Sequence, residues 1–146
     1  MAITSAICNS FKVEILKAVH DFTATSGNTF NLALYTSSAT LNKSTTAYST
    51  SNEISNTSGS AYSAKGKALT SVTPVLSTDT AVCDFSDVSW TSATFRANGC
   101  LIFNDSATGD PAVCAIAFGS DKTVTSGTFT IQFPTADASN AIIRIA

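Results

Sequence analysis

The stretch ANGCLIFNDSATGDPAVCAIAFG, residues 97–119, limits what this chain can fold into more than any other. Two apolar runs flank the short turn DSATGD, which is the pattern of a β-hairpin. In the first run Cys100 and Ile102 share one face of the strand. Leu101 and Phe103 share the other face, because side chains alternate along a strand. Strands that are apolar on both sides are buried on both sides, so we expect this hairpin at the centre of the fold.

Other segments repeat the period-two pattern of strands. TFNLALYT predicts a strand over residues 29–36 with one apolar face, and Pro74 in ALTSVTPVLS predicts an edge strand or a bulge. TAVCDFSDVSW, TSATFRA and SGTFTIQFP predict further strands, and the apolar NAIIRIA predicts a final strand inside a sheet. About seven or eight short strands, roughly ten residues apart, are typical of a mainly β, antiparallel β-sandwich or jelly-roll-like domain.

The segment NSFKVEILKAVHDF predicts one N-terminal α-helix over residues 9–22. Phe11, Ile15 and Val19 recur at helical spacing, and Leu16 widens the apolar stripe. This stripe would pack on the chain's own core, which we favour, or on a partner.

A Ser/Thr-rich segment over residues 37–66 separates the first predicted strand from the others. A stretch of that length without its own secondary structure is unusual inside a compact domain. Tyr48, Ile54 and Tyr62 are spaced widely enough to pin an extended chain at intervals. We expect either an arm that reaches over a neighbouring subunit or a surface loop, in a single domain over residues 1–146 with its β core at 67–146.

Charge and hydropathy argue against several functional classes. The chain has 146 residues, 8 Lys and Arg, and a net charge of -2, too few cations on one face to neutralise DNA phosphates. We expect no direct contact with nucleic acid. No apolar window is long enough to span a bilayer, and the start MAITSAICNSF does not resemble a secretory signal. We therefore expect folding in a reducing cytoplasm, without a membrane partner.

Cysteines and acidic residues in the sequence form no convincing metal site. Cys100 and Cys114 come nearly opposite each other in the predicted hairpin, so a disulfide is conceivable, although buried free thiols are favoured. The cysteines are too isolated for structural zinc. Asp105 and Asp110 bracket the hairpin turn, where capping of their own turn explains them better than calcium does. We expect no bound metal and no cofactor.

Catalytic machinery is equally sparse. His20 is the only histidine, beside Asp21, and a structural role at the end of a helix is favoured over catalysis. Asp84 and Asp87 lie near Trp90, a combination that suits a carbohydrate platform but is better explained as a turn. The sequence predicts no enzymatic activity, with a hydrolase as a distant alternative.

A resemblance extends these inferences. The ending GTFTIQFPTADASNAIIRIA, with ANGCLIFND before it and FKVEILKAVHDF near the start, resembles small structural proteins of tailed bacteriophages. Those proteins have the same order of N-terminal helix, Ser/Thr-rich region, ALT-VTP strand, LIYND-like hairpin and closing FP-ADA-NAIIRI. The resemblance covers nearly the whole chain, and its motifs are structural.

The resemblance implies a virion component assembled in the bacterial host cytoplasm, most plausibly a capsid decoration or cement protein. Its expected partners are the major capsid protein or other virion proteins and further copies of itself, as a trimer. The predicted contact residues belong to the helix and the Ser/Thr-rich segment: Phe11, Ile15, Leu16, Val19, Tyr48, Ile54 and Tyr62. The alternatives are a tail, neck or fibre component and a carbohydrate-binding module that uses Trp90.

Overall fold

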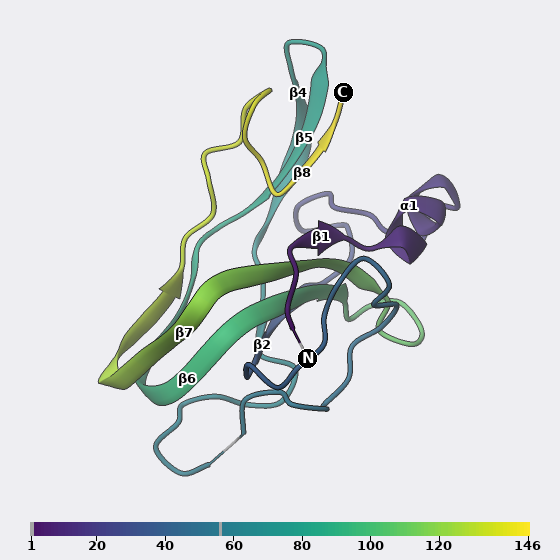
Figure 1. Ribbon diagram of the computed structural model, residues 1–146. Coiled ribbons are helices and arrows are strands. Elements are labelled where there is room, and N and C mark those ends of the chain that lie inside the picture. Colours follow the sequence, from purple (N-terminus) through teal and green to yellow (C-terminus); the bar gives the residue numbers. More distant parts are fainter. Residues whose placement is uncertain (1, 56) are drawn as a thin grey trace.

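A computed structural model describes residues 2–55 and 57–146. The chain forms two antiparallel sheets and has one helix near its N-terminus, which confirms the predicted mainly β, sandwich-type fold (Figure 1). In order, the elements are β1 (Ala6–Ile7), α1 (Asn9–Leu16), β2 (Phe30–Tyr35), β3 (Lys67–Ala68), β4 (Ser71–Ser77), β5 (Thr80–Phe85), β6 (Val88–Asn104), β7 (Ala112–Ile131) and β8 (Ile143–Ile145). The larger sheet has the strand order β1-β7-β6-β2-β3 and the smaller one β4-β5-β8.

The β6–β7 hairpin supplies the two longest strands of the larger sheet. The predicted turn lies at residues 105–110. The register differs from the expected one, in which Cys100 came nearly opposite Cys114: Ile102 pairs with Cys114, and Cys100 pairs with Ile116. The strands are longer than predicted, with 17 residues in β6 and 20 in β7. Segments that we expected to be separate short strands are joined, because β-bulges bend the ribbon without ending its ladder of hydrogen bonds.

The centre of the larger sheet is buried on both faces, as predicted. All six residues of β2 are buried, not only the face with Phe30, and so are residues 99–104 of β6. On one face Tyr48 stacks on Phe103 with ring centroids 4.6 Å apart. On the other face Phe22 stacks on Phe30 at 4.2 Å. Different parts of the chain therefore cover the two faces.

The smaller sheet projects beyond the end of the larger one (Figure 1). Pro74 lies in the edge strand β4, where the register shifts between Val72 and Val75, so the predicted edge position and bulge are confirmed. The prediction for the C-terminal strand is wrong: β8 is the opposite edge of this sheet and leaves Ile145 57% exposed. Within residues 2–55 and 57–146, β5 is the strand that pairs with it.

The helix is shorter than the predicted range of residues 9–22 and ends at Leu16. The amide of Val19 donates to the carbonyl of Glu14 (3.0 Å) and that of Ala18 to the carbonyl of Ile15 (3.3 Å), which closes the last turn. Ala18 has a positive φ of 58°, the left-handed conformation of a Schellman C-cap. The chain then runs extended, which buries the side chains of His20 and Phe22.

The Ser/Thr-rich segment is neither a free arm nor a loose surface loop. It lies on the chain's own sheet, with single bridges from Tyr35 to Glu53 and from Ala47 to Pro111. Apolar side chains along it are buried in the core: Ala39, Leu41, Ile54 and Tyr62. It packs in this way because the apolar face that carries Phe103 would otherwise be exposed to water.

Replacing Ile54 by Ala tests this cover. Loss of a buried side chain of this size costs about 2–5 kcal/mol, which should appear as a lower urea midpoint with an unchanged slope. Ser58→Ala, at an exposed position of the same segment, should stay within about 0.5 kcal/mol. Equal stability of the two variants would mean that the segment does not pack on the sheet.

Candidate functional site

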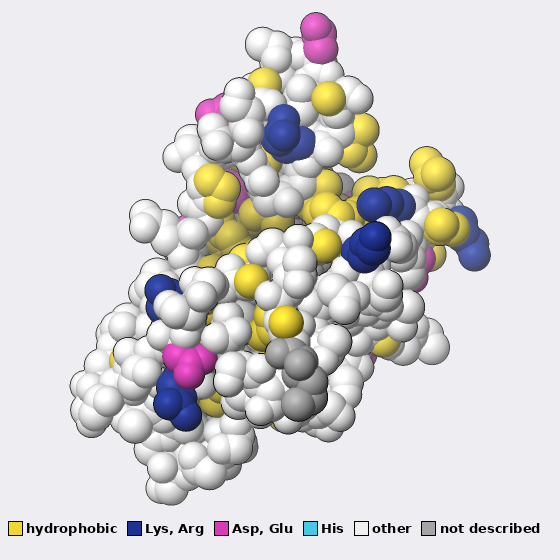
Figure 2. Space-filling model, viewed as in Figure 1, with side chains coloured by type: hydrophobic (Ala, Val, Ile, Leu, Met, Phe, Trp, Pro, Cys, Tyr) yellow, Lys and Arg dark blue, Asp and Glu magenta, His cyan; other side chains and the backbone are white. Residues whose placement is uncertain are grey.

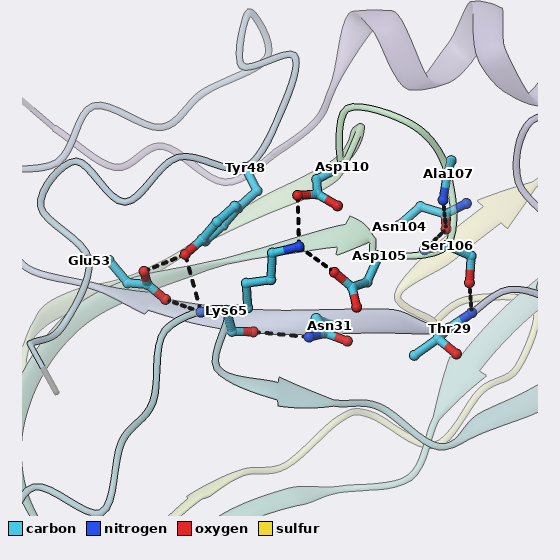
Figure 3. A network of polar contacts seen from close by, with 10 residues as sticks. All are labelled: Thr29, Asn31, Tyr48, Glu53, Lys65, Asn104, Asp105, Ser106, Ala107 and Asp110. Atoms are coloured by element: carbon cyan, nitrogen blue, oxygen red, sulfur yellow. Dashed lines mark hydrogen bonds and ion pairs between the residues drawn. The ribbon is translucent and has the colours of Figure 1, made fainter.

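Glu53 anchors the Ser/Thr-rich segment through both carboxylate oxygens. Its Oε2 accepts a hydrogen bond from the Tyr48 hydroxyl (2.6 Å), and its Oε1 accepts one from the Lys65 amide (2.8 Å) (Figure 3). The Tyr62 hydroxyl also donates to Oε1 (2.7 Å) and accepts from the Leu34 amide (2.9 Å). A general base needs a free lone pair directed at a substrate. Glu53 uses its oxygens on donors of its own chain, which is a structural role.

Lys65 links this segment to the hairpin turn. Its Nζ lies 2.7 Å from Asp105 Oδ1 and 2.9 Å from Asp110 Oδ2 (Figure 3). Hydrogen bonds to Asp105 and then to Asp110 raise the pKa of Lys65 above its usual value. The two aspartates therefore bind a lysine from a distant segment, and our interpretation that they cap their own turn is wrong.

Asn104 caps the turn in their place. Its Oδ1 accepts hydrogen bonds from the amides of Ser106 (3.0 Å) and Ala107 (3.2 Å). On the other side of the same amide group, Nδ2 lies 3.1 Å from His20 Nδ1 and 3.0 Å from Asn28 Oδ1. The side chain of one buried residue thus joins the hairpin turn to the chain that follows the helix.

His20 is buried between this turn and the helix. Its Nε2 lies 2.7 Å from Glu14 Oε2. With Asn104 donating to Nδ1, the proton of a neutral ring lies on Nε2 and points at Glu14. Glu14 and Asn104 engage the two ring nitrogens, and neither nitrogen contacts a serine hydroxyl in the part of the chain that the structure describes. This arrangement supports the structural role predicted for His20, although it lies beyond the end of the helix.

The four cysteines are free and buried: Cys8, Cys83, Cys100 and Cys114. Cys100 pairs with Ile116, so it is diagonal to Cys114 in the ladder, and no disulfide joins them. Among residues 2–55 and 57–146, no group of three or more His, Cys, Asp or Glu side chains could hold a metal ion.

The aromatic platform proposed for a carbohydrate is absent at Trp90. Its side chain is only 1% exposed and packs edge-on against Phe95 and Phe129. Asp84 Oδ1 accepts a hydrogen bond from the adjacent Phe85 amide, and Asp87 Oδ1 accepts one from the amide of Phe133, 46 residues further along the chain. Both carboxylates therefore make structural hydrogen bonds within the chain.

The structure separates the predicted contact residues into two groups. Phe11, Ile54 and Tyr62 are buried in the chain's own core, where they offer no surface to a partner, so the prediction is wrong for them. They are buried because the helix and the long segment both cover the sheet. Ile15, Val19 and Tyr48 are half-buried, whereas Leu16 at the end of α1 is 89% exposed and available for contact.

A feature that sequence reasoning missed lies on one face of the larger sheet. An apolar groove of about 890 Å³ opens between β7 and the segment of residues 132–142, with Cys100 and Cys114 among its lining. Figure 2 shows apolar side chains gathered in this hollow beneath the projecting sheet. Its walls carry the half-buried side chains Ile7, Ile116, Phe118, Val124, Phe129 and Ile142. The alternation in TVTSGTFTIQF indicates an apolar strand face. It does not indicate that no other part of the chain packs on that face.

Compared with known proteins, the chain matches no family model, no curated protein and no solved structure. No helix in the described part of the chain is long and apolar enough to cross a bilayer.

Substituting Glu53 by Gln tests the anchor. One of the carboxylate oxygens becomes an NH₂ donor that faces hydroxyl or amide donors, so a buried hydrogen bond is lost. We expect a cost of about 1–3 kcal/mol in the free energy of unfolding, measured by urea denaturation. The matched change Asp79→Asn, at an exposed turn, should have almost no effect. An unchanged midpoint in Glu53→Gln would contradict the anchoring role.

Burial also makes the thiols hard to ionise. It raises the pKa of Cys8 to about 11 and the pKa values of Cys83 and Cys100 to about 12, and it raises the pKa of Cys114 well above the usual range. An unfolded thiol ionises near pH 8.5. Above that pH the native chain keeps protons that the unfolded chain releases, so stability falls as pH rises.

The free energy of unfolding should therefore be nearly constant from pH 7 to 8 and decrease between pH 9 and 11. Each buried thiol contributes a slope of about 1.4 kcal/mol per pH unit in this window. Urea titrations at several pH values measure the slope, and Cys100→Ala with Cys114→Ala should make it shallower than in the unsubstituted chain. The same midpoint at pH 8 and pH 10 would show that the thiols are not buried.

Proposed function

We propose that this chain is a structural protein of a bacteriophage virion, namely a capsid decoration or cement protein without enzymatic activity. It would bind the major capsid protein or other virion proteins and form a homo-oligomer, with a trimer favoured. It would act in the virion after assembly in the host cytoplasm, with no direct contact to nucleic acid or membrane.

One observation carries the proposal. Large apolar side chains are exposed: Val13, Leu16, Val72, Val75, Leu76 and Ile145. The polar cluster is instead engaged within the chain: the Glu53 carboxylate with the Tyr48 hydroxyl and the Lys65 amide, and the Lys65 ammonium with Asp105. Exposed apolar surface beside satisfied polar groups is typical of a protein that binds other proteins. The phage-like motifs of the hairpin and the C-terminal segment support the virion as the setting.

Physical requirements of a cement protein agree with this surface. Such a protein stabilises a shell by burying area across the seams between capsid subunits, and many copies add their contributions. Few charged residues (12%) mean little desolvation cost when the surface is covered. Leu16 and Val13 at the outer side of α1 are the contact residues that we expect toward the capsid.

Electron microscopy of virions of the phage that encodes this chain tests the proposal. Antibody raised against the purified chain should label the head, in many copies per particle. Label on the tail or neck alone would support the alternative structural role and contradict the cement role. No label anywhere on intact virions would contradict both.

The contact residues can be tested with heads that lack this protein. Added chain should raise the temperature at which the heads open, and Leu16→Gln should weaken this effect by about tenfold in the concentration required. Lys43→Gln, an exposed substitution on the long segment, is the matched control and should behave like the unsubstituted chain. Equal activity of both variants would exclude the end of α1 as the contact surface.

A further inference from the structure

The β4–β5 hairpin, residues 71–85, forms a finger whose tip lacks a cover. Val75 is 61% exposed and its neighbour Leu76 is 70% exposed. Adjacent residues of a strand point to opposite faces, so the tip presents apolar side chains on both faces. Leu76 pairs with Ala81, which pairs in turn with Ile145 of β8, and all three are exposed on one face.

This apolar tip extends a surface that is buried at the base of the finger. Cys83 and Ile143 lie on the same face as Leu76, because they follow it at alternate positions of the sheet. Both are buried against the body. The body of the protein packs on the base of the finger but not on its tip. The tip is therefore a short piece of sheet with both faces exposed to water, which is an unfavourable arrangement.

The groove between β7 and residues 132–142 matches the apolar character of the finger. It is concave and apolar, whereas the finger is convex and apolar. Within one chain the finger does not fill the groove, since Leu76 and Val75 remain exposed. A protrusion and a matching hollow on different parts of one molecule are the elements of contact between copies.

Charge points to the same pairing. Lys122 is the charged residue among those that line the groove, and its Nζ bonds only to Ser120 Oγ (3.1 Å), with no ion pair recorded in the described residues. Asp79 lies in the exposed turn at the tip of the finger and makes no recorded ion pair there either. By contrast Asp121, next to Lys122, already pairs with Arg96 at 3.4 Å.

We propose that the finger of one copy inserts into the groove of a second copy of this chain, with Asp79 of the first opposite Lys122 of the second. Val75 and Leu76 would then be buried against groove residues such as Phe118 and Phe129. The inference rests on the homo-oligomer in the proposed function and names the surfaces that would form it, and it holds whether or not the copies bind a capsid.

Cross-linking between two differently substituted chains tests the geometry. Asp79→Cys and Lys122→Cys are purified separately, mixed, and treated with a short bismaleimide; the native thiols are buried and should not compete. Cross-linked dimer should form in the mixture. Mixing Asp79→Cys with Lys43→Cys, on the Ser/Thr-rich segment, should give none. Equal cross-linking in both mixtures, or none in either, would overturn the proposal.

Association in solution gives an independent readout by sedimentation velocity over a concentration series. Val75→Gln with Leu76→Gln should weaken association about 10- to 100-fold while preserving the melting temperature, since both positions are exposed. Asp79→Lys or Lys122→Asp alone should weaken it about tenfold, and the two together should restore it. Leu16→Gln should leave association unchanged, although it lowers head binding if the proposed function holds.

Three results would contradict the inference. The chain could stay monomeric at millimolar concentration, or associate with an affinity that depends on Leu16 and not on the finger. It could also bind a fatty acid such as palmitate in the groove as a monomer, which would identify Lys122 as a carboxylate site for a small ligand. None of these results depends on whether the antibody labels phage heads. The finger–groove contact and the cement role can therefore fail separately.

Discussion

The centre of the larger sheet is apolar on both sides, and each side has to be shielded from water by another part of the chain. The rest of the structure follows from this requirement. The Ser/Thr-rich segment shields the side of Phe103, where Tyr48 stacks. The extended chain after α1 shields part of the side of Phe30, together with the base of the smaller sheet. The cover on that second side is incomplete, and the uncovered part is the groove.

Local patterns were sufficient to predict the elements of this fold. The hairpin turn, the buried strand at Phe30 and the edge position of Pro74 depend on alternation and on turn chemistry, which neighbouring residues determine. The end of the helix was not predictable in this way. A left-handed C-cap is usually signalled by glycine, and here Ala18 occupies that position, so the apolar spacing appeared to continue to Val19.

The polar clusters depended on contacts that no local pattern contains. Lys65 and Asp105 are 40 residues apart in sequence, and Glu53 meets Tyr62 only after the long segment has folded back on the sheet. Composition suggested an arm over a neighbouring subunit or a surface loop, because Ser and Thr are typical of loops, but a few apolar anchors were enough to bury the segment on its own sheet. The groove could not be predicted for the same reason. A sequence shows which strand faces are apolar, but not which of these faces the rest of the chain leaves exposed.

The tie between Lys65 and the hairpin turn also has a consequence for the order in which this protein folds. The turn at residues 105–110 forms between adjacent segments of β6 and β7, so little chain entropy is lost when it closes. Its two aspartates come together when it closes, and Lys65 Nζ contacts both of them. The contacts of the Ser/Thr-rich segment are therefore complete only on a finished hairpin, so we expect the segment to gain protection from solvent exchange after the hairpin and to lose it earlier.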